Sequence, residues 1–297
     1  MTRHISSADL PQLLQHPKLA RLQTLRLDTN TCLRLTVNTM RLIARLPQLH
    51  TFDAVVLSKR AVASLLRPMP DAPVLTDLTL RRSDLTVSEA ALLNTISQCA
   101  GLRRLSVRSL QFARGLFRSF FTSPNLRRLQ RLELISVLTA EDDVDLIVDP
   151  NGGLLTASGA EEYEAAFGAL EQLQSLTLER VYGMNIFLPH LHRASALRLL
   201  SIRCESDVAY IGIGSAFSTL PSTWSTLPRR DVLSALLASA PQLQVRLHLP
   251  ADLQRCLALH QSTAGDLIPR QQGWRELLAM VAEMERVTVV DWQPPSA

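Results

Sequence analysis

A short pattern of large apolar residues recurs along this chain at an almost constant interval. It reads apolar, two other residues, apolar, one other residue, apolar, and the first residues of five successive copies step by 27, 26, 27 and 27. The copies are Leu22-Leu25-Leu27, Leu49-Phe52-Ala54, Leu75-Leu78-Leu80, Leu102-Leu105-Val107 and Leu129-Leu132-Leu134. Such a period is typical of repeat proteins, in which each unit is stable only when it stacks on its neighbours.

The same pattern returns further along the chain. Three more copies are Leu173-Leu176-Leu178, Leu197-Leu200-Ile202 and Met284-Val287-Val289, and a looser one is Leu243-Val245-Leu247-Leu249. Alternate residues of a β-strand point to opposite sides, so the apolar residues of each copy face a core and those between them face away. The pattern predicts parallel strands near residues 24–28, 51–55, 77–81, 104–108, 131–135, 175–179, 199–203 and 286–290.

Helical patterns fill the intervals between the predicted strands. Ser158 and Glu161 have the spacing of a capping box, which marks the start of a helix. After this capping box, Tyr163, Ala166, Phe167 and Leu170 form an apolar face at helical spacing. A later interval has a similar face, formed by Leu233, Leu236, Leu237 and Ala240. Strands stack roughly 4.8 Å apart, whereas helices need about 8–10 Å, so a stack of these units has to curve. The expected fold is therefore an α/β solenoid, a curved horseshoe with a parallel sheet on its concave face and helices on its convex face.

One stretch carries a family resemblance particularly clearly. Residues 75–107, LTDLTLRRSDLTVSEAALLNTISQCAGLRRLSV, resemble intracellular leucine-rich repeats. They are most similar to the ribonuclease-inhibitor-like type and to the cysteine-containing type found in F-box adaptors. The resemblance implies a scaffold that binds a protein partner on its concave face, in the F-box case as the substrate-recognition part of a ubiquitin ligase.

The predicted organisation is a single leucine-rich-repeat domain over residues 1–297 with two insertions. The steps from Leu129 to Leu173 and from Leu197 to Leu243 are 44 and 46 residues, well above the usual period. The excess places the insertions near residues 138–158 and 205–228. Insertions in repeat proteins project from one face, and sometimes from the binding face.

Composition narrows the classes of function. The net charge of +4 is too small to make nucleic acid the expected partner, and the four cysteines lie far apart with no CxxC pair for zinc. No apolar run has the roughly 18 residues of a membrane span, and the first residues lack the apolar core of a signal peptide, so we expect a cytoplasmic or nuclear protein.

The catalytic signatures GxSxG and HExxH, the P-loop and a complete GxGxxG do not occur in the sequence. Gly212 and Gly214 lack the third glycine of a dinucleotide loop, and His190 and His192 have no further metal ligands nearby in the sequence. We therefore expect a binding protein without enzymatic activity or cofactor. The alternative is a catalytic or regulatory domain whose site lies in the two insertions.

Charge is segregated along the chain. Between Ala90 and Leu132 there are eight arginines and no acidic residue, and from Leu132 to Glu179 there are eleven acidic residues and no basic one. Either the two blocks neutralise each other, for example with the acidic insertion folded onto the arginines, or the basic block is an anion-binding surface.

The repeat register places several arginines at equivalent positions of neighbouring strands. Arg81 is equivalent to Arg108, and Arg104 to Arg131, so the strands would hold each pair about 5 Å apart at the backbone. With Asp77, Thr79, Ser106, Glu133 and Ile135, these residues are expected to face solvent on the concave side. We predict that the four arginines bind an acidic segment of a protein partner, and that Trp224, in a polar loop, is an additional exposed anchor.

Overall fold

The computed structural model describes residues 10–27, 36–56, 75–82, 93–94, 96–97, 99, 101–108, 116–135, 157–179, 181, 184–203, 228–250 and 284–292. Trp224 lies outside these residues, and so does nearly all of both predicted insertions. In this part of the chain the fold is α/β, with helices and one parallel sheet.

Nine strands of the described chain form the sheet, and their order in the sheet is their order in the sequence. They are β1 (Thr24–Arg26), β2 (Thr51–Val56), β3 (Asp77–Arg82), β4 (Arg104–Arg108), β5 (Arg131–Ile135), β6 (Ser175–Glu179), β7 (Leu199–Arg203), β8 (Gln244–Pro250) and β9 (Val287–Trp292). All eight predicted strands are confirmed, and the ninth, β8, falls on the looser copy of the pattern.

Helices occupy the intervals between strands. The α-helices are α1 (Leu10–Leu14), α2 (Val37–Ala44), α5 (Leu116–Phe121), α6 (Ala157–Ala169), α7 (Met184–Phe187) and α8 (Arg230–Ser239); the 3-10 helices are η1 (Pro17–Arg21), η2 (Pro124–Leu126) and η3 (Leu188–Arg193). The predicted apolar faces of α6 and α8 are buried. Because α6 begins at Ala157, Ser158 lies inside its first turn instead of preceding the helix as the capping box predicted.

The register of the sheet joins equivalent positions of the apolar pattern. Phe52 pairs with Leu78, Leu78 with Leu105, and Leu105 with Leu132. Leu132 pairs directly with Leu176 even though that step spans 44 residues. The extra length of the long intervals therefore does not disturb the stacking of the strands.

A repeated hydrogen-bond arrangement fixes this register at the start of the strands. The carbonyl of Gln23 accepts from the backbone N–H groups of both His50 and Thr51, at 2.9 and 3.0 Å. Equivalent carbonyls of His50, Thr76, Arg103, Gln130 and Gln174 each accept two N–H groups from the next unit in the same way. Each unit is thus tied to the preceding one by the same backbone bonds, and this favours one register over a slipped one.

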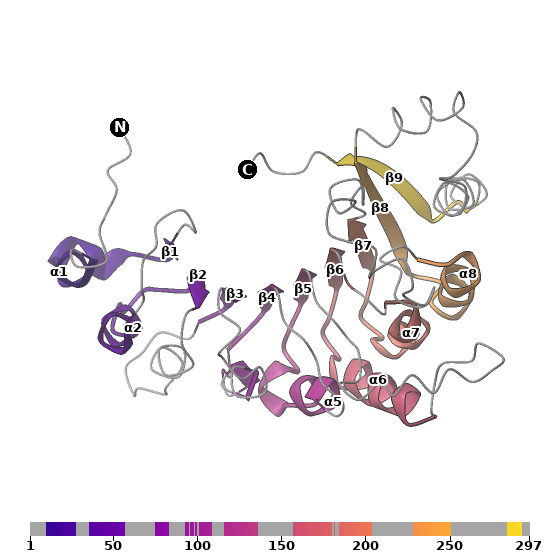
Figure 1. Ribbon diagram of the computed structural model, residues 1–297, viewed down its shortest axis with the longest axis horizontal. Helices are drawn as coiled ribbons and strands as arrows, with labels where there is room; N and C mark the ends of the chain where they lie inside the picture. The colour runs from indigo at the N-terminus through magenta and orange to yellow at the C-terminus, as the bar shows by residue number, and fades with distance from the viewer. Residues whose placement is uncertain are drawn as a thin grey trace, which may run out of the picture.

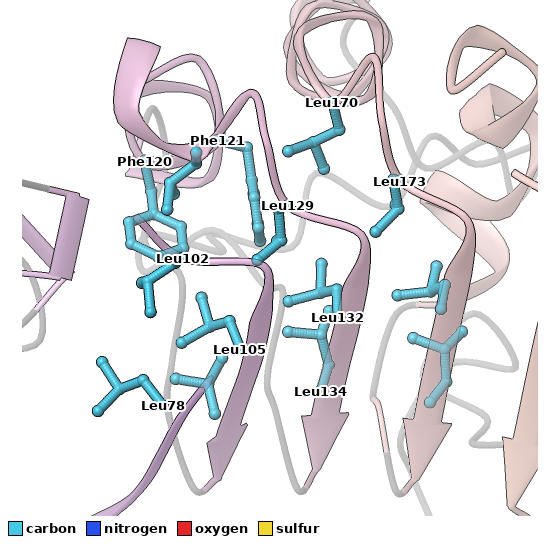
Figure 2. Close-up of a cluster of buried hydrophobic side chains, with 14 of the residues drawn as sticks. Leu78, Leu102, Leu105, Phe120, Phe121, Leu129, Leu132, Leu134, Leu170 and Leu173 are labelled. Atoms are coloured by element: carbon cyan, nitrogen blue, oxygen red, sulfur yellow. The ribbon is translucent and has the colours of Figure 1, made fainter. Parts of the chain in front are cut away.

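The core lies between the sheet and the helices. Leu78 and Leu105 are 2% and 1% exposed, as predicted. Figure 2 shows the leucines of neighbouring strands lying in rows on one side of the sheet, with Phe120 and Phe121 reaching toward them from α5. Neighbouring units therefore share one continuous core, and none of them buries its apolar side chains alone.

Figure 1 shows the strands following one another along an arc, with α2, α5, α6, α7 and α8 on its outer side. We call the opposite face of the sheet, which is turned away from these helices, the inner face. Its side chains are those that alternate with the buried apolar residues of each strand. The inner face is thus the part of the molecule where nine consecutive strands bring together residues that are mostly polar.

Candidate partner-binding surface

Polar residues of the inner face fall into rows that cross the strands. The first row includes Asp77, Arg104 and Arg131, and the second includes Thr79, Ser106 and Glu133. Arg81 and Arg108 are Cα partners in a third row, which continues through Ile135, Glu179, Arg203 and His248. The predicted equivalence of Arg81 with Arg108, and of Arg104 with Arg131, agrees with this register.

Arg104 is exposed but has an acidic neighbour. Its Nε lies 3.3 Å from Oδ1 of Asp77 on the preceding strand, and its side chain remains 57% exposed. The other carboxylate oxygen of Asp77 accepts from the Thr76 hydroxyl at 2.7 Å. Asp77 therefore offsets part of the charge of Arg104 and leaves most of its guanidinium open to solvent.

Further exposed arginines surround Arg104 at the start of β4 and β5. Arg131 is its Cα partner on β5 and is exposed, and so are Arg103, Arg127 and Arg128 in the turns that lead into these strands. We call these five residues the arginine edge. Within the described part of the chain, Arg104 is the one member of the edge with an acidic partner.

Two residues that were predicted to face solvent are buried. Ser106 is 7% exposed and Ile135 is 2% exposed. Alternation along a strand predicts the face on which a side chain lies, but not whether other groups cover that face. Burial is favourable for the apolar Ile135, whereas the Ser106 hydroxyl has no hydrogen-bond partner in the described structure.

A charged group further along the third row was missed by the sequence analysis. Arg203 Nη1 donates to Oε2 of Glu179 at 3.0 Å, and the Glu179 side chain is 10% exposed. His248 on β8 is the Cα partner of Arg203. The repeat register could have placed these three residues in one row, but the looser pattern around β8 kept that strand out of the predicted set.

On the helix side, Glu164 of α6 binds two residues of η3. Its Oε2 accepts from Arg193 at 2.9 Å, and its Oε1 lies 3.6 Å from Nδ1 of His190. The hydrogen bond from Arg193 lowers the pKa of Glu164, and burial lowers the pKa of His190 despite the nearby carboxylate. His192 is bound instead to the Pro189 carbonyl at 2.8 Å.

The described residues offer little support for chemistry at a metal or thiol. They include no group of three or more histidine, cysteine or acidic residues that could hold a metal ion. Burial raises the pKa of Cys99 to about 11, so its thiol stays protonated and is a poor nucleophile near neutral pH. Among the helices described, none has the length and apolar character needed to cross a membrane.

Comparison with models of known protein families and with curated protein sequences gives no match. The arrangement of the inner face is therefore the basis for a functional interpretation. It offers exposed guanidinium groups in neighbouring strands, which bind carboxylate or phosphate groups through paired hydrogen bonds.

Proposed function

We propose that this chain is a leucine-rich-repeat horseshoe that acts as a protein-interaction scaffold. Three observations support this architecture. Equivalent leucines of successive strands are paired, backbone carbonyls before the strands each accept two N–H groups from the next unit, and the helices lie on the outer side of the arc. In such a fold the sheet is the concave face. A concave face of parallel strands offers a broad, pre-formed surface to a partner, which reduces the conformational entropy lost on binding.

The arginine edge is the observation that carries the proposal. Backbones of adjacent strands are about 5 Å apart, and two like charges at that distance repel by roughly 0.8 kcal/mol in water. Arg104 and Arg131 are Cα partners, so their guanidinium groups can come this close, and among the described residues only Arg104 has an ion-pair partner. A carboxylate from a partner would relieve the repulsion and could accept two hydrogen bonds from one guanidinium.

The partner proposed is a protein with an acidic segment. A net charge of +4 is small for a protein that binds the regularly spaced phosphates of nucleic acid. Asp77 and Glu133 also lie among the arginines, and they would repel a continuous phosphate backbone. Separate acidic side chains of a protein can instead contact the arginines individually.

A labelled acidic peptide tests the proposal directly. Fluorescence anisotropy would compare a fluorescein-labelled oligoglutamate peptide with a glutamine peptide of equal length. We expect the double variant Arg104→Ala, Arg131→Ala to weaken oligoglutamate binding at least ten-fold, and we expect binding to fall as salt rises. The double variant Arg41→Ala, Arg45→Ala removes the same number of charges from two exposed arginines at α2, on the helix side, and is the matched control.

Two results would count against the arginine edge as the binding surface. One is equal binding of oligoglutamate by the wild type and the folded double variant. The other is an equally large loss in Arg41→Ala, Arg45→Ala, because the peptide would then sense total charge and not a site. Circular dichroism and thermal unfolding of each variant would establish that it is folded.

A further inference from the structure

A second group of basic residues lies on the inner face, away from the arginine edge. Arg203 of β7 and His248 of β8 are Cα partners, and Arg246 precedes His248 by two residues on the same side of β8. We call these three residues the β7–β8 basic cluster. The strand register alone therefore brings three basic side chains together on two adjacent strands.

Acidic groups neutralise the cluster only in part. Glu179 binds Nη1 of Arg203, and Arg246 has no ion pair in the described structure. On the other side of His248, β9 places Val290 as its Cα partner and Thr288 beside it, neither of which is charged. At the inner-face positions of β6 to β9, the carboxylate of Glu179 accompanies two guanidinium groups and one imidazole.

The guanidinium of Arg203 also keeps an unused donor. Its Nε is buried and has no hydrogen-bond partner in the described part of the protein. Buried donors are nearly always paired, and an unpaired one raises the free energy of the folded state. An acceptor brought by a ligand, after a modest rotation of the Arg203 side chain, would satisfy it.

The pKa of His248 also indicates that an anion would be favourable at this cluster. Burial lowers the pKa of His248, and the charges of Arg203 and Arg246 lower it further. The two arginines are therefore close enough to disfavour a third positive charge. A bound anion would reverse this effect.

We propose that the β7–β8 basic cluster is an oxyanion site, which takes a carboxylate or phosphate group of the partner. The inference rests on the proposed function and makes the partner more specific. Measured along the sheet, β4 and β8 are four strand spacings apart, on the order of 20 Å. The partner would then carry two acidic groups separated by roughly that distance, one for the arginine edge and one for this cluster.

Protonation of His248 and binding of the anion are linked. Each stabilises the other, so a bound anion raises the pKa of His248. For the same reason, lowering the pH below about 6.5, the ordinary pKa of histidine, strengthens anion binding. Glu179 reduces the effect through its bond to Arg203 but does not cancel it, because Arg246 has no ion pair with any described residue.

Histidine titration by NMR tests the site without any partner. The ¹³Cε1–¹H signals of the full chain would be followed from pH 5 to 8 in sodium chloride, sodium sulfate and sodium acetate at equal ionic strength. Loss of one signal in His248→Gln assigns the residue. We expect sulfate or acetate to raise the pKa of His248 by at least 0.5 relative to chloride, and the exposed His50 is the internal control. A larger shift with sulfate favours a phosphate group, and a larger shift with acetate favours a carboxylate.

Two variants decide whether the cluster is responsible. Arg246→Gln changes an exposed side chain and should at least halve the anion-dependent shift, whereas Arg41→Gln should leave it unchanged. The inference is wrong if His248 shifts no more than His50, or if Arg246→Gln retains the full shift. The Arg104→Ala, Arg131→Ala variant should keep the shift while losing oligoglutamate, so failure of this site and failure of the proposed function are distinguishable.

Discussion

Asp77 Oδ1 lies 3.3 Å from Arg104 Nε, an ion pair that joins β3 to β4 across the inner face. Both side chains are partly open to solvent, and exposed pairs of this kind contribute only about 0–1 kcal/mol to the free energy of unfolding. The pair therefore matters more for the charge presented by Arg104 than for holding the two strands together.

Asp77→Asn should change stability little and binding noticeably. The substitution removes the negative charge beside Arg104, so we expect the affinity for the oligoglutamate peptide to rise about two- to five-fold, which corresponds to roughly 0.4–1 kcal/mol, as for other exposed pairs. Urea unfolding should show a change below about 1 kcal/mol. Weaker peptide binding by a folded Asp77→Asn protein would show that Asp77 positions Arg104 for the partner and does not compete with it.

Leu78→Ala and Leu105→Ala should each lower the free energy of unfolding by about 2–5 kcal/mol, because both side chains are buried between the sheet and the helices. Since each unit rests on its neighbours, hydrogen exchange should accelerate in the adjacent strands as well as in the mutated one. A loss below about 0.5 kcal/mol at either position would contradict the assigned core.

The sequence predicted strands well where the spacing of the apolar residues is regular. The predicted ranges 104–108, 131–135, 175–179 and 199–203 coincide with β4 to β7. Leu243 precedes Val245 by two residues instead of three, so the pattern around β8 is out of phase by one residue. In the structure Val245 still pairs with Leu200, because the turn before β8 is one residue shorter.

The binding surface could be predicted less completely than the strands. Periodicity places Ser106 and Ile135 on the inner face, but their burial depends on tertiary cover that a period of two residues does not encode. The pair of Glu179 with Arg203 depends on the register between β6 and β7, a step of 24 residues that differs from the usual period. Side-chain contacts across strands therefore needed the three-dimensional structure.

Arg286→Ala should loosen the C-terminal part of the sheet. Arg286 donates to the carbonyl groups of Leu237, Ala240 and Pro241 at 2.6, 3.0 and 2.8 Å, where α8 ends and its carbonyls lack partners within the helix. We expect a loss of about 1–3 kcal/mol, typical of hydrogen bonds that involve a charged donor.

Hydrogen exchange would locate the effect of Arg286→Ala. Amides of α8 and β9 should exchange faster, whereas those of β2 and β3 should keep their protection. Arg246→Ala, on the neighbouring strand with an exposed side chain, is the control and should change stability by less than about 0.5 kcal/mol. Uniform loss of protection in all strands would show that the sheet unfolds as one cooperative unit.

Stability should fall as the pH drops below about 6.5, in part because of His190. Burial lowers the pKa of His190 in the folded state, against the opposing influence of Glu164. Between the ordinary histidine pKa near 6.5 and the lower folded value, the unfolded chain binds a proton that the folded chain does not. Acidification through this range therefore favours unfolding, and the stability difference is complete once both states are protonated.

The His190→Gln variant isolates this contribution. Its melting temperature should decline less than that of the wild type from pH 7 to pH 5, because one group with a lowered pKa has been removed. His248, whose pKa is also lowered, contributes to the remaining decline. The lowered pKa of Glu164 acts only at lower pH, where its carboxylate becomes protonated and its bond to Arg193 is lost. His50→Gln is the control for an exposed histidine, and parallel melting curves of wild type and His190→Gln over this pH range would refute the role assigned to His190.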